Sequence, residues 1–320
     1  MGKIPDIIVV NGHGLGEYCD VKRIPQPGET CVAYNRRFEM DAGKGTNVAC
    51  AIGRLGGDVS FVAKSGTDQC GELGYRWITE SNVDPSYYWL DPSIESCLGL
   101  CIIAENGENM LLDFDNDLYC VQPDEAERCV RKMKGARFLC SGFGQAVETG
   151  LTACRVGKEL GMVTLLNPSP LRDGLELPNM SYVDVLCVNE GESRTLLGLP
   201  PTDETPYERL GTLLRERYGC ASVVMTLGAQ GCCGVTAEGS WRIPGTRVTM
   251  VDETGAGDGF LAAITYCLSR GRTLKQAMEW ANVYSAYLVT KSGSLEYYPW
   301  KEQIPEIFAS LHREDLLFEE

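Results

Sequence analysis

The chain has 320 residues, of which 44% are hydrophobic and 23% charged, so it can form one large α/β domain with an appendage, or two small domains, around a substantial core. Its formal net charge at pH 7 is −15. Because such a surface repels nucleic-acid phosphates and anionic membranes, neither is an expected partner. We see no apolar stretch near the ~20 residues of a membrane span and no signal peptide, and we expect a soluble cytoplasmic protein.

The first element expected along the chain is a buried strand at residues 7–10, an apolar run that ends in a glycine-rich turn. Further strands are expected at 29–38, 59–63, 98–104, 109–114, 138–141, 163–166, 183–188 and 222–226, followed by a hairpin-rich segment at 232–251. Helices are expected at 43–55, 71–81, 149–160, 190–197, 206–218, 258–269 and 274–290. The repeated alternation predicts an α/β fold with a doubly wound, mainly parallel sheet flanked by helices.

Two early segments interrupt this alternation. Residues 15–40 and 98–117 are strand-like, and neither is followed at once by a helix. The second contains Asn106-Gly107, which is a strong hairpin-turn signal. We predict that these two segments form a small β-sheet lid, and that residues 1–14, 41–97 and 118–320 form the α/β core that binds nucleotide and substrate.

Fifteen cysteines are scattered along the chain without a Cys-x-x-Cys pair, and there are only two histidines. This composition argues against a Cys/His zinc site. Most of the cysteines lie in apolar surroundings, so we interpret them as small buried side chains of a protein from a reducing compartment.

Small residues gather just before the helix expected at 258–269. Gly255, Ala256 and Gly257 allow neighbouring backbone N–H groups to point into one concavity, and the helix start adds the positive end of its dipole. Such a nest suits a phosphoryl group that is being transferred. The carboxylate of Asp258 stands where it can take a proton from an attacking hydroxyl. The alternative is that Asp258 only caps the helix.

A second glycine-rich motif, Ala42–Asn47, opens the first long helix. Its backbone amides can meet substrate oxygens, and Asn47 can both donate to and accept from a diol. A plain helix start with a solvated lysine is the alternative. Neither motif is a Walker A sequence, and the glycines at residues 12–16 do not fit a Rossmann fingerprint because the third is misplaced.

Taken together and in this order, the two motifs resemble the signatures of the ribokinase-like carbohydrate kinase family, also called the PfkB family, and the overall pattern is nearest to the bacterial ribokinases. Further segments that fit the family in the same order are Pro27–Thr30, Asn167-Pro168, Asn189–Glu192 and Thr226–Gly231. The resemblance extends from residue 7 to about residue 300 and implies an ATP- and Mg²⁺-dependent kinase.

The resemblance also implies roles for individual residues. It makes Asp258 the catalytic base, and it makes the amides of Gly255, Ala256 and Gly257 the anion hole. Residues that would face the acceptor are Gly43, Lys44 and Asn47. Residues that would organise Mg²⁺ near the ATP phosphates, largely through water, are Asn189 and Glu192. Residues that would line the nucleotide cleft are Thr226, Gly228, Gly231 and, at the adenine or its ribose, Asn282.

Many members of the family also bind a monovalent cation beside the anion hole. In this chain the backbone carbonyls of Asp252 and Thr254 would contribute, together with others from residues 288–293. The chain departs from the pattern at Tyr297, where ribokinases place a serine ligand, so activation by K⁺ is left open.

The acceptor is less well defined. The family places a sugar-binding aspartate five residues after the glycine that ends its first strand, which here gives Glu17, with Asp20 as a stand-in; a solvated lid carboxylate is the alternative. Acidic and amide groups at 113, 115, 116 and 117 could bind a polyol or simply face water. We therefore predict a sugar or polyol kinase, with a nucleoside kinase or a non-catalytic sugar-binding regulator as alternatives. The exposed strands of the lid could also pair in a homodimer.

Overall fold

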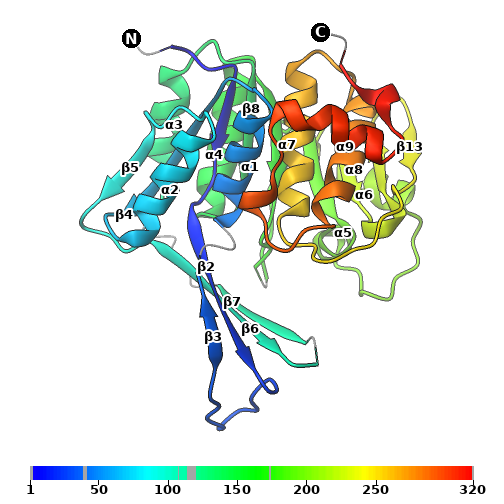
Figure 1. Cartoon of the computed structure of the whole chain (residues 1–320). Helices are drawn as coiled ribbons and strands as arrows, with labels where there is room; N and C mark the ends of the chain where they lie inside the picture. The colour runs from blue at the N-terminus through cyan, green and yellow to red at the C-terminus, as the bar shows by residue number, and fades with distance from the viewer. Residues whose placement is uncertain (1–2, 39–41, 107, 114–119, 173, 319–320) are drawn as a thin grey trace.

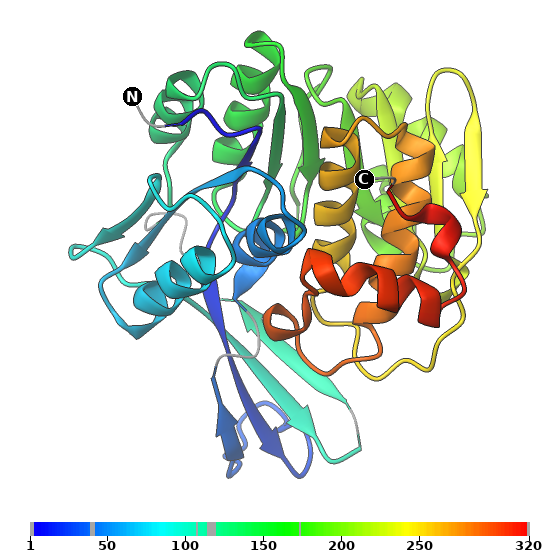
Figure 2. The same ribbon diagram turned by 45° about the horizontal axis from the view of Figure 1, so that its top comes forward.

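The computed structural model describes residues 3–38, 42–106, 108–113, 120–172 and 174–318, and over these residues it contains two sheets of unequal size. The larger sheet forms the body of the molecule with its helices. The smaller sheet stands away from the body on one side in both views (Figures 1 and 2). The predicted doubly wound sheet with a separate β-sheet lid is confirmed, whereas the predicted division into core and lid residues stays a prediction.

The larger sheet has the strand order β13-β12-β11-β10-β9-β8-β1-β4-β5. Its parallel strands are β1 (Ile7–Val10), β4 (Val59–Gly66), β5 (Tyr88–Asp91), β8 (Phe138–Gly142), β9 (Val163–Asn167), β10 (Val185–Asn189) and β11 (Ser222–Thr226). The antiparallel strands at one edge are β12 (Cys232–Val235) and β13 (Ser240–Ile243). Because the parallel strands end at one edge, Asn189 and Thr226 come to lie side by side there.

Helices cover both faces of this sheet. Alternate residues of β1 enter different hydrophobic clusters: Ile7 and Val9 join one, and Ile8 and Val10 join the other. The first cluster is completed by α1 (Gly43–Arg54), α2 (Gln69–Glu80), α7 (Ala256–Ser269), α8 (Leu274–Leu288) and α9 (Ile304–Ser310). The second is completed by α3 (Pro123–Lys132), α4 (Val147–Glu159), α5 (Glu190–Leu197) and α6 (Tyr207–Tyr218). A strand that is apolar at every position is therefore buried on both sides.

The smaller sheet has the strand order β3-β2-β6-β7. Its members are β2 (Gly14–Val21), β3 (Tyr34–Arg37), β6 (Cys97–Ala104) and β7 (Asn109–Asp113). The two central strands run parallel, and each outer strand is antiparallel to its neighbour. The predicted hairpin of β6 and β7 is present. The predicted lid residues 39–40, 107 and 114–117, including Asp115, Asn116 and Asp117, lie outside the described residues.

Several element boundaries differ from those expected, including those of β3, α7 and the hairpin-rich segment. The strand expected at 29–38 is reduced to β3, because its register against β2 shifts and Asn35 adopts a positive φ of 49°. The helix expected from Asp258 begins at Ala256, because Gly255 supplies the left-handed N-cap. The hairpin-rich segment ends with β13, and residues 244–251 carry no strand.

Some elements were not expected from the sequence, namely α3, α9 and β5. The cysteines fit the expectation of small buried side chains, since all but Cys31 and Cys97 are buried. Among the described residues, no helix combines the length and apolar character needed to cross a bilayer.

Candidate functional site

A cavity of about 100 Å³ opens at the edge of the large sheet where the parallel strands end. It brings together segments far apart in the chain: the start of α1, the ends of β9, β10 and β11, and the first turns of α5 and α7. The residues lining it are Lys44, Asn167, Ser169, Cys187, Val188, Asn189, Glu192, Thr226, Gly257, Asp258, Phe260 and Leu261. Six of these are residues singled out for the kinase site, from Lys44 to Asp258.

Asp258 lies in the first turn of α7 and is only 8% exposed. The buried side chain of Asn47, from α1, donates through Nδ2 to Asp258 Oδ2 at 2.9 Å. The hydroxyl of Ser294 donates in turn to Asn47 Oδ1 at 3.5 Å. The sequence did not suggest this contact of Asn47. Through it, Asn47 holds one oxygen of the carboxylate that is expected to act as the base.

The turn before α7 is shaped by Gly255. Its φ of 74° and a Cβ position only 2.4 Å from Ser294 Cβ leave room for glycine alone. Its carbonyl accepts from Tyr298 Oη at 2.9 Å. A Cβ on Gly257 would meet nothing within 4 Å, so the backbone there is open toward the cavity. The amide of Ala256, in contrast, already donates to Glu253 O at 3.1 Å, so the open part of the expected nest is narrower than three amides.

Asn189 and Glu192 form a reciprocal capping box at the start of α5. Glu192 N donates to Asn189 Oδ1 at 2.7 Å, and Asn189 N donates to Glu192 Oε2 at 2.8 Å. Both residues also line the cavity. Because the cap uses one oxygen of Glu192, the other carboxylate oxygen is left to meet a cation or its water, and these two residues fit the expected Mg²⁺ site.

Three residues expected to contact the nucleotide lie apart from the cavity lining, and two of them, Gly231 and Asn282, meet around one loop, residues 243–246. Gly231 has a φ of 91°, and a Cβ there would lie 2.0 Å from Ile243 O. Asn282, on α8, donates through Nδ2 to Pro244 O at 3.0 Å. Gly228 begins a single 3₁₀ turn just before Gly231. The fold alone therefore explains why residue 231 is a glycine and why Asn282 donates one hydrogen bond to the loop.

The segments expected to bind a monovalent cation lie side by side. Asp252 Oδ1 accepts from Thr254 N at 2.9 Å and from Thr254 Oγ1 at 2.7 Å, while Asp252 Oδ2 accepts from Gly293 N at 2.9 Å. Val289 O accepts from the amides of Val251 and Asp252. These bonds bring the carbonyl-bearing loops near 252–254 and 289–293 together, as a shared ion would require.

Glu17 lies on β2 in the lid and forms an ion pair with Arg36 of β3. The guanidinium of Arg36 also lies 4.4 Å from the ring centre of Phe38. Three residues further along β2, Asp20 accepts from Arg37 and Asn35, and these bonds hold the pKa of Asp20 below its ordinary value. The lid arginines therefore neutralise lid carboxylates.

Around the acceptor side of the site, the structure places Lys44 on the cavity and Gly43 at the first position of α1. Ser169 also lines the cavity, although no sequence motif singled it out. A signal for it existed, since it directly follows the Asn167-Pro168 segment, and Asn167 itself donates to Cys187 O at 2.9 Å at the cavity wall.

Comparisons with known proteins agree with this geometry. The family model described as "pfkB family carbohydrate kinase" matches residues 18–301. The chain is 26% identical over 306 residues to the ribokinase of Staphylococcus aureus, covering 94% of this chain and 99% of that protein. It is also 26% identical over 301 residues to the deoxyribokinase of Salmonella typhimurium, covering 94% and 98%.

Solved structures share the fold. The ribokinase of Thermotoga maritima superposes with a TM-score of 0.82 at 21% identity, covering 95% of this chain and 99% of that one. The Arabidopsis thaliana ribokinase, solved in complex with ribose and ATP, superposes with a TM-score of 0.81 at 19% identity, covering 99% and 100%. With a family model that matches most of its length, this chain belongs to the pfkB family of carbohydrate kinases.

Proposed function

We propose that this protein transfers the γ-phosphoryl group of ATP to a hydroxyl of a small sugar or polyol, with Asp258 as the general base. The observation that carries the proposal is the position of Asp258. Its carboxylate is oriented by Asn47, lies in the first turn of a long helix, and lines the same cavity as Lys44, Asn189 and Glu192. A base, residues that can hold a cation and a helix N-terminus around one cavity are the parts that phosphoryl transfer requires.

The chemistry follows from these positions. The acceptor oxygen attacks the γ-phosphorus while its proton passes to the carboxylate of Asp258, and the bond from γ-phosphorus to the β–γ bridging oxygen breaks as ADP leaves. The open backbone at Gly257 and the helix dipole stabilise charge on the transferring group. Lys44 adds a positive charge on the same wall of the cavity.

Cations would bind at two places in this scheme. Glu192 and Asn189 would hold Mg²⁺, largely through water, and the ion would neutralise phosphate charge when bound. The carbonyls of Asp252 and Thr254, next to the 289–293 loop, would hold K⁺. The bonds that join these two loops support the second site.

The acceptor would lie under the lid, between Glu17 and the start of α1. The names of the relatives, ribokinase and deoxyribokinase, make a pentose the first candidate. One relative favours a nucleoside instead: the aminoimidazole riboside kinase of Salmonella typhimurium, 27% identical over 296 residues, covering 86% of this chain.

The test is ADP release from Mg²⁺-ATP against a panel of pentoses, hexoses, polyols and nucleosides, with Asp258→Asn as the control for background hydrolysis. A single strong sugar or polyol would support the proposal. A nucleoside hit alone would replace it with the second candidate. Silence across the panel in a protein that still binds ATP would overturn both.

A further inference from the structure

Two cysteines meet where one arm of the lid leaves the body and returns to it. Cys97 is the first residue of β6, and Cys120 lies between β7 and α3 in the chain. Their Sγ atoms are 3.7 Å apart. Since a disulfide is about 2.05 Å long, the two sulfurs are thiols in van der Waals contact.

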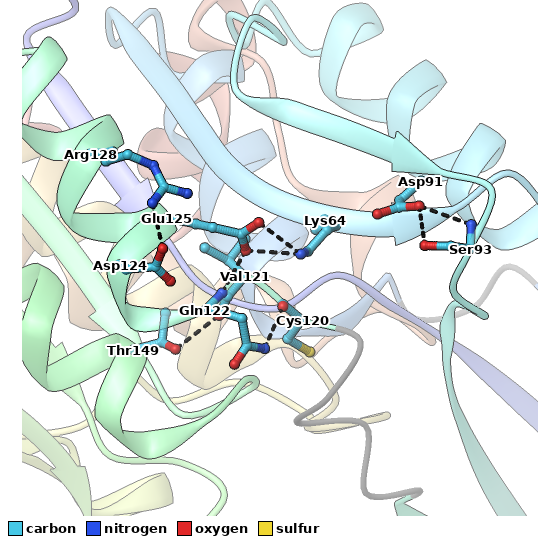
Figure 3. Close-up of polar contacts among 10 residues, drawn as sticks. All are labelled: Lys64, Asp91, Ser93, Cys120, Val121, Gln122, Asp124, Glu125, Arg128 and Thr149. Atoms are coloured by element: carbon cyan, nitrogen blue, oxygen red, sulfur yellow. Dashed lines mark hydrogen bonds and ion pairs between the residues drawn. The ribbon is translucent and has the colours of Figure 1, made fainter.

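Both thiols stand on anchored backbone. Cys97 is paired with Gly14 in the ladder of β2 and β6. Cys120 O accepts from Gln122 Nε2 at 3.0 Å, and Thr149 Oγ1 donates to the adjacent Val121 O at 2.9 Å (Figure 3). The contact between the sulfurs is therefore set by the sheet and by the body of the molecule.

Hydrogen bonds and an ion pair also hold the segment that follows Cys120. Gln122 N donates to Glu125 Oε2 at 2.8 Å, and Lys64, on β4, binds both oxygens of Glu125 at 3.0 and 2.9 Å (Figure 3). With a side-chain exposure of 13% for Lys64 and 26% for Glu125, this pair is partly shielded from solvent. It ties the segment after Cys120 to the large sheet.

The surroundings of this pair differ from those of the other buried cysteines. Cys97 is half-buried and Cys120 is buried, so an oxidant from solvent reaches Cys97 first. Two other buried thiols are protected: burial raises the pKa of Cys70 to about 12 and that of Cys129 to about 11, which keeps them from the reactive thiolate form.

We propose that Cys97 and Cys120 are a modification site, which a hydroperoxide converts to a reversible disulfide that staples the base of the β6–β7 arm. The Cys97 thiolate attacks a peroxide oxygen, the O–O bond breaks, and a sulfenic acid forms. The Cys120 sulfur then attacks Cys97 Sγ, and the S–O bond breaks as water leaves. In total, two thiols and one H₂O₂ give one disulfide and two waters.

The consequence for catalysis rests on the proposed function. β6 pairs with β2 along its whole length, so it moves with the strand that carries Glu17. A staple at its base would hinder lid opening, and product release would slow. We expect kcat to fall at least about threefold on oxidation, to recover with dithiothreitol, and ATP affinity to stay unchanged.

The experiment treats the full-length protein with H₂O₂, alkylates the remaining thiols, and maps cross-linked peptides by mass spectrometry, with kinetics before oxidation, after it and after reduction. A Cys97–Cys120 cross-link with the reversible fall in kcat supports the proposal. Each of the variants Cys97→Ser and Cys120→Ser should lose the cross-link and the fall in kcat on oxidation. Thermal melting of the reduced variants checks that they fold.

Matched controls separate this site from other thiols. Cys31→Ser removes the exposed lid cysteine and should leave both the cross-link and the inhibition in place. Three results would overturn the proposal. The oxidised protein could carry a cross-link between other cysteines and not between Cys97 and Cys120, or the Cys97–Cys120 cross-link could form without lowering kcat. Oxidation could also inhibit Cys97→Ser as strongly as the wild type. The cross-link is also mapped in Asp258→Asn, where its detection requires no kinase activity. A failure of the proposed kinase function is therefore distinguished from a failure of disulfide formation.

Discussion

The neighbours of Asp258 determine the hydration and the hydrogen bonding of its carboxylate. A carboxylate that is 8% exposed loses most of its hydration, and the amide of Asn47 and the N-terminal end of α7 replace part of it. The charge of Asp258 also acts beyond the site: burial, helped by a smaller contribution from this charge, outweighs a hydrogen bond with Thr265 and raises the pKa of Cys140 to about 12. The site therefore holds its charge in a place where water cannot screen it well.

Asp258→Asn should keep the shape of the site while removing the proton acceptor. We expect kcat to fall by at least ~10²-fold, the usual scale for loss of a general base, with ATP affinity near normal. ADP-release kinetics give kcat, and calorimetric titration gives the ATP affinity. Turnover close to that of the wild type would remove Asp258 from its role.

Asn47→Ala tests whether the amide orients the base. Loss of a buried hydrogen bond to a carboxylate should lower kcat by about 10- to 100-fold, since such a bond contributes roughly 1.5–3 kcal/mol. The effect should vanish when Asp258→Asn is already present, because there is no base left to orient. Independent, additive losses in the double variant would mean that Asn47 acts on something else.

At the scale of elements, local signals explain which boundaries could be predicted. α5 was expected with its observed limits, because the capping box of Asn189 and Glu192 opens it and Gly198, with a φ of 70°, ends it. α3 has comparable signals, namely Pro123 at its start and a capping box of Gln122 with Glu125. Its sequence is short and mostly polar, so the helix was not recognised from its apolar residues.

The parts that could not be predicted depend on contacts between distant segments. Asn47 and Asp258 are 211 residues apart, so no local pattern shows that one holds the other. The shortening of β3 depends on its register against β2, which is a property of the pair. The cavity residues Lys44, Asn189, Glu192, Thr226 and Asp258 were predicted one by one from motifs, whereas their meeting place follows from the order of strands.

Within the lid, Glu17→Ala should raise the KM of the acceptor by about tenfold or more and leave the KM of ATP nearly unchanged, since a lost hydrogen bond to a charged group contributes roughly 1.5–3 kcal/mol. Steady-state kinetics with each substrate varied in turn give both values. Glu29→Gln is the matched control, because Glu29 lies between β2 and β3 and is also paired with an arginine. Equal changes in both variants would point to lid charge in general.

The N-cap of α2 gives a prediction on pH. Burial would raise the pKa of Asp68, but hydrogen bonds from Ser96, Gly71 and Cys70 outweigh it and hold the pKa below 3.8. A carboxyl with a lowered folded-state pKa stabilises the fold above its unfolded pKa, and this stabilisation is lost as pH falls through the folded value. Asp68→Asn should therefore lower the unfolding free energy at pH 7, by up to about 1 kcal/mol.

The same difference between Asp68→Asn and the wild type should shrink as the pH is lowered from about 5 to below 3.8, where the wild-type carboxyl takes up its proton. Urea unfolding at a series of pH values measures it. A difference that stays constant with pH would show that the charge of Asp68 adds nothing beyond its cap.

For the whole molecule, the lid presents apolar side chains to solvent. Leu98, Met110 and Leu112 are 37%, 38% and 47% exposed on neighbouring strands, and Phe38 is 38% exposed beside β3. We propose that two copies pack through their lids and cover these groups. Light scattering after size exclusion should then give twice the 35.1 kDa mass of the chain.

Leu112→Asp should shift this mass to that of one chain, because it would bury a charge in the contact. Met250→Asp is the control, since Met250 is 65% exposed outside the lid and should leave the mass unchanged. A wild-type mass of 35.1 kDa at all concentrations would contradict the dimer.

The place of β1 in the middle of the large sheet has a consequence for biosynthesis. This first strand is apolar throughout and needs β4 on one side and β8 on the other, so the ribosome must add residues up to 142 before both neighbours exist. At bacterial or eukaryotic elongation rates this takes roughly 7 to 30 seconds. During that interval the nascent chain carries an unpaired edge, and we expect it to depend on chaperones that bind emerging apolar segments.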